Sequence, residues 1–372
     1  MNKNVLITGG AGFIGSHLAD HLLNRGYNIR VLDNLCEQVH GSASETPNYL
    51  NEAVEFIAGD VRDPQIVAKA VLGMDFVFHL AAMVGVGQSM YEIKEYTDVN
   101  NVGTAVLLET LAQNPVEKLI VASSMSVYGE GLYKNRDGEI SEAKERSVNQ
   151  FKNGDWEVYN DKGDKLIPYP THENKRPALS SVYALSKYDQ ERLCLMIGNA
   201  YNIPTAALRF FNVYGTRQSL SNPYTGVLAI FASRFLNNNP PLIFEDGNQM
   251  RDFVSVHDVT LACRLALENQ NSAGEVFNIG SGKSITINEI AYRMARVIGK
   301  TDIIPEVTGK YRVGDIRHCF ADISKAERIL GFQPQVSFED GLIELADWLK
   351  NQKAVDNINT AQYELAARGL TV

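Results

Sequence analysis

The feature that most constrains this chain is a glycine-rich turn between an apolar segment and a helical pattern near the N-terminus. The stretch NVLITGGAGFIGSHL spaces Gly9, Gly12 and Gly15 as G-x-x-G-x-x-G. Glycines at such a turn let backbone N–H groups approach a pyrophosphate, and the N-terminus of the next helix adds unpaired donors. The turn predicts a dinucleotide-binding unit, in which Phe13 and Ile14 are expected contacts as well.

Apolar segments of strand length alternate with helical patterns through the first half of the chain. Strands are expected at 4–10, 28–34, 54–63, 75–82 and 117–124, and helices at 13–27, 63–73 and, as one long helix, 90–113. This alternation predicts right-handed βαβ units and a parallel sheet covered on both faces. The expected fold class is α/β, a Rossmann-type doubly wound parallel sheet with a smaller C-terminal α/β substrate-binding lobe.

Residues at the ends of the later strands fit the same ligand. Asp33 ends the second strand, where a carboxylate accepts hydrogen bonds from a ribose 2′-hydroxyl and repels a 2′-phosphate. The sequence therefore favours NAD over NADP. The other strand-end residues expected to contact the cofactor are Asn34, Asp60, Val61, Leu80, Ala81 and Ala82.

A Tyr-x-x-x-Lys pattern follows the fifth strand. Tyr183 and Lys187 lie four residues apart on an expected helix, so they share one face. An ammonium beside a phenol lowers the pKa of the phenol, which makes the tyrosine usable as a general base. The strand ends in Ser123 and Ser124. Because side chains alternate along a strand, we expect Ser124 to face the site and Ser123 to point away.

With these motifs in place, the chain resembles extended short-chain dehydrogenases/reductases of the NAD-dependent epimerase/dehydratase family. The resemblance runs from residue 4 to about 350, through TGGAGFIGSHL, LDN, GDVRD, HLAA, NNVGT, SSMSVYG, YALSK, LRFFNVYGTRQ, FEDGNQMRDFVSVHD and YRVGDIR in that order. It implies bound NAD, a nucleoside-diphosphate sugar as substrate, and a homodimer formed through the helices at about 90–113 and 183–200.

The resemblance also implies roles for single residues. Ser124, Tyr183 and Lys187 would be catalytic, and Tyr183 and Lys187 would contact NAD together with Asn100 and Phe210. Arginines suit the substrate diphosphate because their planar fork matches phosphate oxygens, and Phe244 would stack on the base. The expected substrate-binding residues are Val84, Ser124, Ser126, Tyr183, Asn212, Phe244, Arg251, Arg312 and Asp315.

The residues after Ser124 discriminate among the reactions of the family. Its 4,6-dehydratases resemble Thr-Asp-Glu at this point, and its sugar-acid decarboxylases carry a glutamate two positions after the Ser or Thr. This chain has Met125 and Ser126, and neither can act as an acid or base near neutral pH. We therefore expect 4-epimerisation: Tyr183 takes the 4-hydroxyl proton while NAD takes the hydride, the keto-sugar turns, and both are returned.

A narrower resemblance concerns the substrate. SSMSVYGEG and SNPYTGVLAIFASRFLNNNPPLIFEDG are similar to dTDP-L-rhamnose 4-epimerase-type sequences, which implies a dTDP-6-deoxyhexose such as dTDP-L-rhamnose. UDP-glucose or UDP-N-acetylglucosamine, or another epimerase or reductase reaction of the family, is the alternative. Val84 stands where UDP-galactose 4-epimerases tend to have a lysine. A non-catalytic NAD-binding scaffold is the remaining alternative, and the retained Ser124, Tyr183 and Lys187 argue against it.

A polar insertion at 131–176 separates Ser124 from Tyr183. Two roles are open for it: a lid or wall over the sugar, or a surface or dimer contact. Relatives of the narrower type carry cysteine pairs in this insertion, which suggests a zinc knuckle. This insertion has no cysteine, so we expect no metal.

The bulk composition limits the partners and the compartment. A net charge of -9 without a basic stripe disfavours nucleic acid, and no apolar run approaches the roughly 20 residues that span a bilayer. Four widely spaced cysteines fit reduced thiols, so we expect a cytoplasmic protein without a membrane partner.

The chain length favours two structural units, because 372 residues exceed what one small core usually serves. We expect 1–216, joined by parts of 252–282, to form the NAD-binding domain. Residues 217–251 and 283–350 would form the substrate lobe, and 351–372 a tail that is either helical or loosely ordered.

Overall fold

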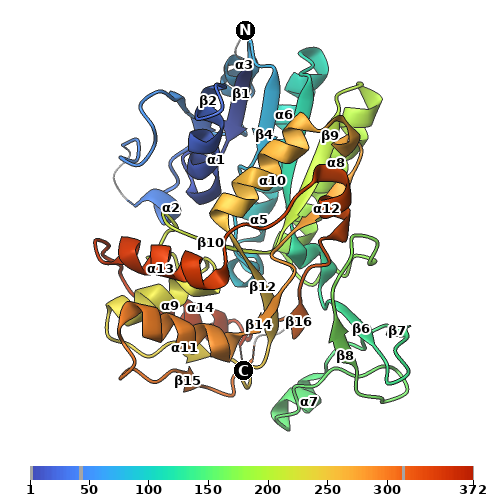
Figure 1. Cartoon of the computed structure of the whole chain (residues 1–372), viewed down its shortest axis with the longest axis vertical. Helices are drawn as coiled ribbons and strands as arrows, with labels where there is room; N and C mark the ends of the chain where they lie inside the picture. The colour runs from blue at the N-terminus through green and yellow to red at the C-terminus, as the bar shows by residue number, and fades with distance from the viewer. Residues whose placement is uncertain (1–2, 42–44, 312–314, 372) are drawn as a thin grey trace.

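The computed structural model describes residues 3–41, 45–311 and 315–371. Arg312, one of the expected substrate contacts, lies outside the described residues. A seven-stranded parallel sheet in the order β13-β9-β5-β4-β1-β2-β3 forms the centre of the molecule (Figure 1), as the sequence predicts. Its strands are β1 (Asn4–Thr8), β2 (Asn28–Asp33), β3 (Glu55–Ala58), β4 (Phe76–His79), β5 (Lys118–Ser124), β9 (Thr205–Phe210) and β13 (Val276–Ile279).

Helices cover both faces of this sheet. One face carries α1 (Phe13–Leu23), α10 (Val256–Glu268) and α12 (Ser324–Leu330), and the other carries α3 (Pro64–Val71), α6 (Gly103–Gln113) and α8 (Val182–Ala200). The strand order reverses between β1 and β4, whose neighbours continue in opposite directions. In open α/β sheets a ligand crevice forms at the carboxyl ends of the strands beside such a reversal.

The helix expected at 90–113 is not one regular helix, and this part of the prediction is wrong in detail. A short α4 (Val86–Ser89) comes first, then α5 (Ile93–Thr97), one π-helical turn (Asp98–Val102) and α6. The wide turn is held on its inner side by Thr104, whose Oγ1 donates to the carbonyl of Asn100 at 2.5 Å. Turns of this kind inside helices are frequent at functional sites.

A smaller lobe has its own core, formed by α9 (Val227–Leu236), α11 (Ile287–Ile298) and α13 (Phe338–Leu349). A four-stranded sheet, separate from the central one, contains β10 (Asn212–Tyr214), β12 (Met250–Ser255), β14 (Ser284–Thr286) and β16 (His318–Cys319). A two-stranded sheet pairs β11 (Leu242–Ile243) with β15 (Glu306–Val307). The C-terminal tail is helical and forms α14 (Ile358–Ala367), in the lower part of the molecule in Figure 1.

The insertion forms a separate three-stranded sheet, which projects at the lower right of Figure 1. The sheet consists of β6 (Leu132–Lys134), β7 (Ile140–Ser141) and β8 (Ile167–Tyr169), and the insertion also contains the short helix α7 (Val148–Lys152). The remaining short helices are α2 (Glu37–His40), η2 (Met125–Tyr128) and η3 (Gln270–Ser272). Within the described ranges, no helix combines the length and apolar character that crossing a membrane requires.

Candidate active site

A cavity of about 680 Å³ lies at the carboxyl ends of the central strands. Its lining runs from the glycine-rich turn, past the ends of β4 and β5, to the lobe. The predicted site residues that line it are Gly9, Gly12, Phe13, Ile14, Gly15, Asp33, Asn34, Val61, Leu80, Ala81, Ala82, Val84, Ser124, Ser126, Tyr183, Lys187, Phe210, Asn212, Phe244, Arg251 and Asp315. Residues distant in the sequence thus meet around one space.

The glycine-rich turn fits a dinucleotide pyrophosphate. Gly9 has φ +70°, and a Cβ there would lie 2.8 Å from the backbone nitrogen of Ala81, so only glycine is accommodated. A Cβ on Gly15 would collide with the carbonyl oxygen of Gly9. Gly12 is the N-cap residue of α1 and has no side chain that could cap the helix. The first N–H groups of the helix are therefore available to an anionic ligand.

Asp33 is nine-tenths buried and ties the turn to the end of β2. Its Oδ2 accepts a hydrogen bond from the backbone N–H of Ala11 at 3.0 Å, and its Oδ1 accepts one from that of Leu35 at 2.9 Å. A carboxylate has further lone pairs beyond these two bonds. Asp33 can thus hold the turn and still accept a hydrogen bond from a ribose hydroxyl.

Two expected cofactor contacts do not line the cavity. The Asp60 carboxylate is occupied by the Arg62 guanidinium, with contacts of 2.8 and 2.9 Å, and by Asn34 Nδ2 at 3.1 Å. The hydrogen bonds from Arg62 hold the pKa of Asp60 at about 2. Asn100 is completely buried in the π-helical turn. Both side chains are thus bonded to protein partners and lie outside the cavity lining, and their direct contact with the cofactor stays a prediction.

Asn100 instead positions a loop that lines the cavity. Its Oδ1 accepts from the backbone N–H of Met83 at 2.7 Å, and its Nδ2 donates to the Met83 carbonyl at 3.1 Å and to Ser186 Oγ at 2.9 Å. These bonds fix the segment after β4 against α8. The cavity-lining residues Ala82 and Val84 flank Met83, so Asn100 sets where they stand.

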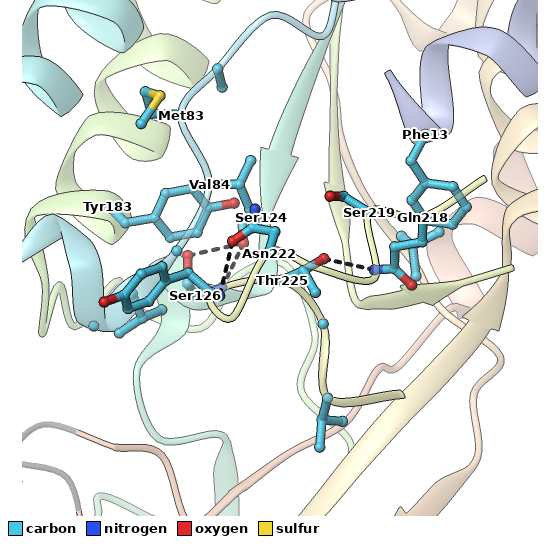
Figure 2. A pocket seen from close by; sticks show the side chains of 18 of the residues that line it. Phe13, Met83, Val84, Ser124, Ser126, Tyr183, Gln218, Ser219, Asn222 and Thr225 are labelled. Carbon is cyan, nitrogen blue, oxygen red and sulfur yellow. Dashed lines mark hydrogen bonds between the residues drawn. The ribbon is translucent and has the colours of Figure 1, made fainter. Parts of the chain in front are cut away.

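Ser124, at the end of β5, faces Tyr183, in the first turn of α8 (Figure 2). The Ser181 side chain caps α8 by accepting from the Ala184 N–H at 3.1 Å, which fixes where the helix begins. Ser123 points away and donates to Glu191 at 2.7 Å, whereas Ser124 Oγ accepts from Ser126 Oγ at 2.9 Å. The predicted alternation of the two serines is confirmed.

Desolvation dominates the electrostatics of Tyr183. Burial raises the pKa of Tyr183, and the Ser124 hydroxyl acts in the opposite direction. The effect of the Lys187 ammonium on the pKa of Tyr183 stays a prediction. Burial also lowers the pKa of the Lys187 ammonium to about 8. Its Nζ donates to Gln190 Oε1 at 2.6 Å.

The far end of the cavity is cationic on one side. The Arg251 guanidinium donates to the carbonyls of Met250 and Arg317 at 2.9 Å and to that of Ile316, and it lies 3.7 Å from the Asp315 carboxylate. Its charge is therefore held in the cavity wall by backbone acceptors. Burial of an arginine in this manner creates a rigid positive site.

Sequence reasoning missed a loop that crosses the cavity. Gln218, Ser219, Asn222, Tyr224 and Thr225 all line it, and Figure 2 shows this segment passing between Phe13 and Ser124. The Asn222 Oδ1 accepts from Gln38 Nε2 at 3.1 Å. The Pro-Tyr-Thr-Gly run before α9 is typical of a turn. It does not indicate which distant residues the turn contacts.

The C-terminal helix is the second element that sequence reasoning left open. Ile358, Ala361, Gln362 and Leu365 of α14 line the cavity. Asp356, just before the helix, forms a buried ion pair with Arg234 of α9 at 2.9 Å. The tail is thus part of the cavity wall.

The insertion does not line the cavity: none of the described residues from 131 to 176 does so. It packs instead against the segments that carry Phe244 and Asp315. Arg146 donates to Glu245 at 2.8 Å and to the Asp315 carbonyl at 2.9 Å, and the Phe151 ring lies 4.4 Å from the Tyr311 ring. Of the two open roles, this geometry matches a surface contact that supports the wall from outside. Among the described residues, no cluster of three or more His, Cys, Asp or Glu side chains could hold a metal ion.

The site as a whole is that of a dinucleotide-dependent enzyme, with a phosphate-binding turn, a Ser–Tyr–Lys group and a lobe that lines the same cavity. The chain belongs to the NAD dependent epimerase/dehydratase family, whose model matches residues 5–152 and 156–280. NAD is accordingly its cofactor, and the turn and Asp33 described above fit it.

Named relatives cover nearly the whole chain. It is 36% identical to a dTDP-L-rhamnose 4-epimerase of Burkholderia thailandensis, over 94% of this chain and 96% of that protein. It is 34% identical to a putative UDP-glucose 4-epimerase of Methanocaldococcus jannaschii, over 93% and 98%.

Solved structures give the same picture. The fold is similar to a UDP-N-acetylglucosamine 4-epimerase from Methanobrevibacter ruminantium in complex with UDP-N-acetylmuramic acid (TM-score 0.76, 31% identity, 94% of this chain and 99% of that one). It is also similar to a UDP-glucose 4-epimerase of Thermus thermophilus in complex with NAD (TM-score 0.74, 30% identity, 94% and 99%).

Proposed function

We propose that this protein is an NAD-dependent nucleoside-diphosphate-sugar 4-epimerase. The observation that carries the proposal is that Ser124 and Tyr183 face each other inside a cavity that also contains the phosphate-binding turn. A sugar hydroxyl placed at these two oxygens would lie beside a base and a hydrogen-bond donor. Bound NAD supplies a reversible hydride acceptor, so the sugar carbon can be oxidised and then reduced on its other face.

The proposed roles of the side chains follow from their positions. Tyr183 accepts the proton of the 4-hydroxyl and later returns it, while Ser124 orients that oxygen and shortens the path of the proton. Lys187 places a positive charge near the phenol and favours its ionised form. Because desolvation raises the pKa of Tyr183, the ammonium and the bound cofactor have to offset this unfavourable effect on the phenolate.

The distribution of carboxylates argues against elimination and decarboxylation. Among the described residues that line the cavity, the carboxylates are Asp33, Glu95 and Asp315. Asp33 holds the glycine-rich turn, Glu95 pairs with Arg62 at 3.0 Å, and Asp315 lies near Arg251. Beside Ser124 stands Ser126 instead, which gives no acid or base to expel water.

We propose a dTDP-6-deoxyhexose, such as dTDP-L-rhamnose, as the substrate. The 36% identity to a dTDP-L-rhamnose 4-epimerase supports this choice. Val84 also supports it, since this exposed apolar side chain (54%) stands beside Ser124 and Tyr183 in the cavity (Figure 2). An apolar contact suits a methyl group and gives no hydrogen bond to a 6-hydroxyl. UDP-glucose or UDP-N-acetylglucosamine is the alternative, favoured by the second relative.

The proposed assembly is a homodimer through α6 and α8, and the proposed location is the cytoplasm. Val102, Leu185 and Met196 are exposed apolar residues at or on these two neighbouring helices (46, 46 and 57%). A second copy of the chain would cover them. Light scattering after chromatography tests this, because Leu185→Glu should convert a dimer to a monomer, and an unchanged mass would exclude this interface.

The test of the reaction is proton NMR of the purified enzyme, without added NAD, against dTDP-L-rhamnose, UDP-glucose and UDP-N-acetylglucosamine. The appearance of a 4-epimer from one of them supports the proposal and identifies the preferred substrate. A product epimerised at another carbon, or a reduced product formed only with added NADPH, would contradict it. Tyr183→Phe serves as the inactive control.

A further inference from the structure

Among the described residues, Lys187 Nζ has one hydrogen-bond partner, the fully buried Gln190. Gln190 lies one turn after Lys187 on α8, has no exposed surface, and accepts a hydrogen bond from Lys187 Nζ to its Oε1 at 2.6 Å. Both side chains are more than nine-tenths buried. In such surroundings an ammonium depends strongly on the few acceptors that reach it.

The hydrogen-bond directions behind Gln190 can be derived from one hydroxyl. Thr104 Oγ1 has a single hydrogen, which it donates to the Asn100 carbonyl at 2.5 Å. It must therefore accept from its two other neighbours, His79 Nε2 at 2.9 Å and Gln190 Nε2 at 2.8 Å. His79 is neutral, because burial lowers its pKa to about 3. Its proton thus sits on Nε2, and its Nδ1 accepts from Thr8 Oγ1 at 2.8 Å.

This network favours one orientation of the Gln190 amide, in which Nε2 also lies 3.3 Å from His79 Nε2. Its NH₂ group faces the Thr104 oxygen, and its carbonyl oxygen faces Lys187. A flipped amide would place the NH₂ group against the ammonium, which is donor against donor in a dry site. The acceptor for Lys187 is therefore held in place by the sheet and by α6, both of which lie outside the Ser–Tyr–Lys group.

We propose that Gln190 is a positioning residue that holds the Lys187 ammonium beside Tyr183, with Thr104 and His79 fixing the orientation of its amide. The inference rests on the proposed function only in taking Tyr183 as the base. Gln190 is not among the described residues that line the cavity, so it would act through Lys187.

The expected sign follows from the charges around the pair. The titratable groups that face Lys187 and Tyr183 are Glu191 and Cys194 of α8, His79 of β4 and Tyr96 of α5. Loss of the Gln190 oxygen removes an acceptor from a buried ammonium and disfavours its charged form. Less positive charge beside Tyr183 stabilises its phenolate less, so the pKa of Tyr183 rises.

The test is a spectroscopic titration of the enzyme as purified with its NAD. Phenolate absorbance near 295 nm is followed from pH 6 to 11, and the spectrum of Tyr183→Phe is subtracted to isolate Tyr183. Gln190→Met keeps the length of the side chain and removes the amide; it should raise the midpoint by about one pH unit. Thr104→Val, which removes the hydroxyl that orients the amide, should raise it by less. Gln113→Met, at an exposed site on α6, is the control.

Each result decides the proposal. A raised midpoint in a variant with unchanged circular dichroism and thermal midpoint supports it, and the rising limb of the kcat/KM profile should move by the same amount. A folded Gln190→Met with an unmoved Tyr183 midpoint overturns it and leaves Gln190 a packing residue. If Gln190→Met does not fold, Thr104→Val decides in the same way. Since the absorbance needs no turnover, a raised midpoint without epimerisation would reject the proposed function and keep this inference.

Discussion

Arg209 and Glu191 form a buried bidentate ion pair behind Ser123 and Ser124. The guanidinium of Arg209 donates through Nε at 2.9 Å and through a terminal nitrogen at 2.6 Å, and Ser123 Oγ donates to the same carboxylate at 2.7 Å. Glu191 belongs to α8, two turns after Tyr183, while Ser123 precedes Ser124 on β5. The Glu191 carboxylate thus joins α8, which carries the proposed base, to β9 through Arg209 and to β5 through Ser123.

Breaking this ion pair should destabilise the protein strongly. Glu191→Gln leaves a buried guanidinium without its counter-charge, which costs about 3–5 kcal/mol. Urea unfolding followed by circular dichroism measures the loss. The matched control is Lys350→Met, which removes the exposed ion pair with Asp347 and should cost about 0–1 kcal/mol. Equal losses in both variants would show that the buried pair does not hold α8 to β9.

Tyr183→Phe should lower kcat by about 10²–10⁴-fold, because it removes the proposed proton acceptor. Ser124→Ala should lower kcat by a smaller factor, since the phenol remains. Both variants should keep their bound NAD, measured by absorbance of the supernatant after denaturation. Tyr201→Phe, at a half-exposed position after α8, should keep full activity. A Tyr183→Phe enzyme with nearly full kcat would require another base.

The C-terminal wall should detach when its anchor is removed. Asp356→Ala leaves Arg234 buried without its carboxylate, and it also removes the bond from Asn239 Nδ2 at 2.7 Å. We expect limited proteolysis to remove residues after 354 in this variant and KM to rise more than kcat falls. Glu364→Ala, which breaks an exposed pair with Arg368 on the same helix, should leave both properties unchanged. Resistance of Asp356→Ala to proteolysis would contradict the assigned anchor.

Acid should weaken the contact between α1 and the loop that crosses the cavity. His17 Nδ1 donates to the Phe13 carbonyl at 2.9 Å, its Nε2 lies 3.0 Å from Thr216 Oγ1, and burial lowers the pKa of His17 to about 4. The unfolded chain binds a proton at about 6.5, so stability is complete above pH 6.5 and falls as the pH drops toward 4. In His17→Gln this part of the pH dependence should disappear in urea unfolding at pH 7, 5.5 and 4.5. An identical pH dependence in both proteins would assign the acid sensitivity elsewhere.

The parts of the site that depend on short-range patterns could be predicted from the sequence. Gly9, Gly12 and Gly15 act through the backbone of one turn, and Tyr183 with Lys187 through one helix face, so spacing alone locates them. The alternation of Ser123 and Ser124 follows from the strand. These features need no knowledge of distant partners.

The remaining parts depend on pairings that spacing does not encode. Asn100 meets Met83 because of a single π-helical turn, and Gln38 meets Asn222 across 184 residues. The contact between Asp60 and Arg62 is an exception, because the two residues lie only two positions apart in the sequence. The raised pKa of Tyr183 depends on its burial, which the i, i+4 spacing of a lysine does not reveal.

The most direct test of the central claim follows the hydrogen at C4. A nucleotide sugar labelled with deuterium at C4 is mixed with an unlabelled second nucleotide sugar of different mass, in ordinary water and without added NAD. We predict that the 4-epimer retains its deuterium at C4 and that none appears in the second sugar, because the hydride returns to the molecule from which it came. Loss of the label to solvent, or its transfer to the other sugar, would contradict 4-epimerisation through a retained cofactor.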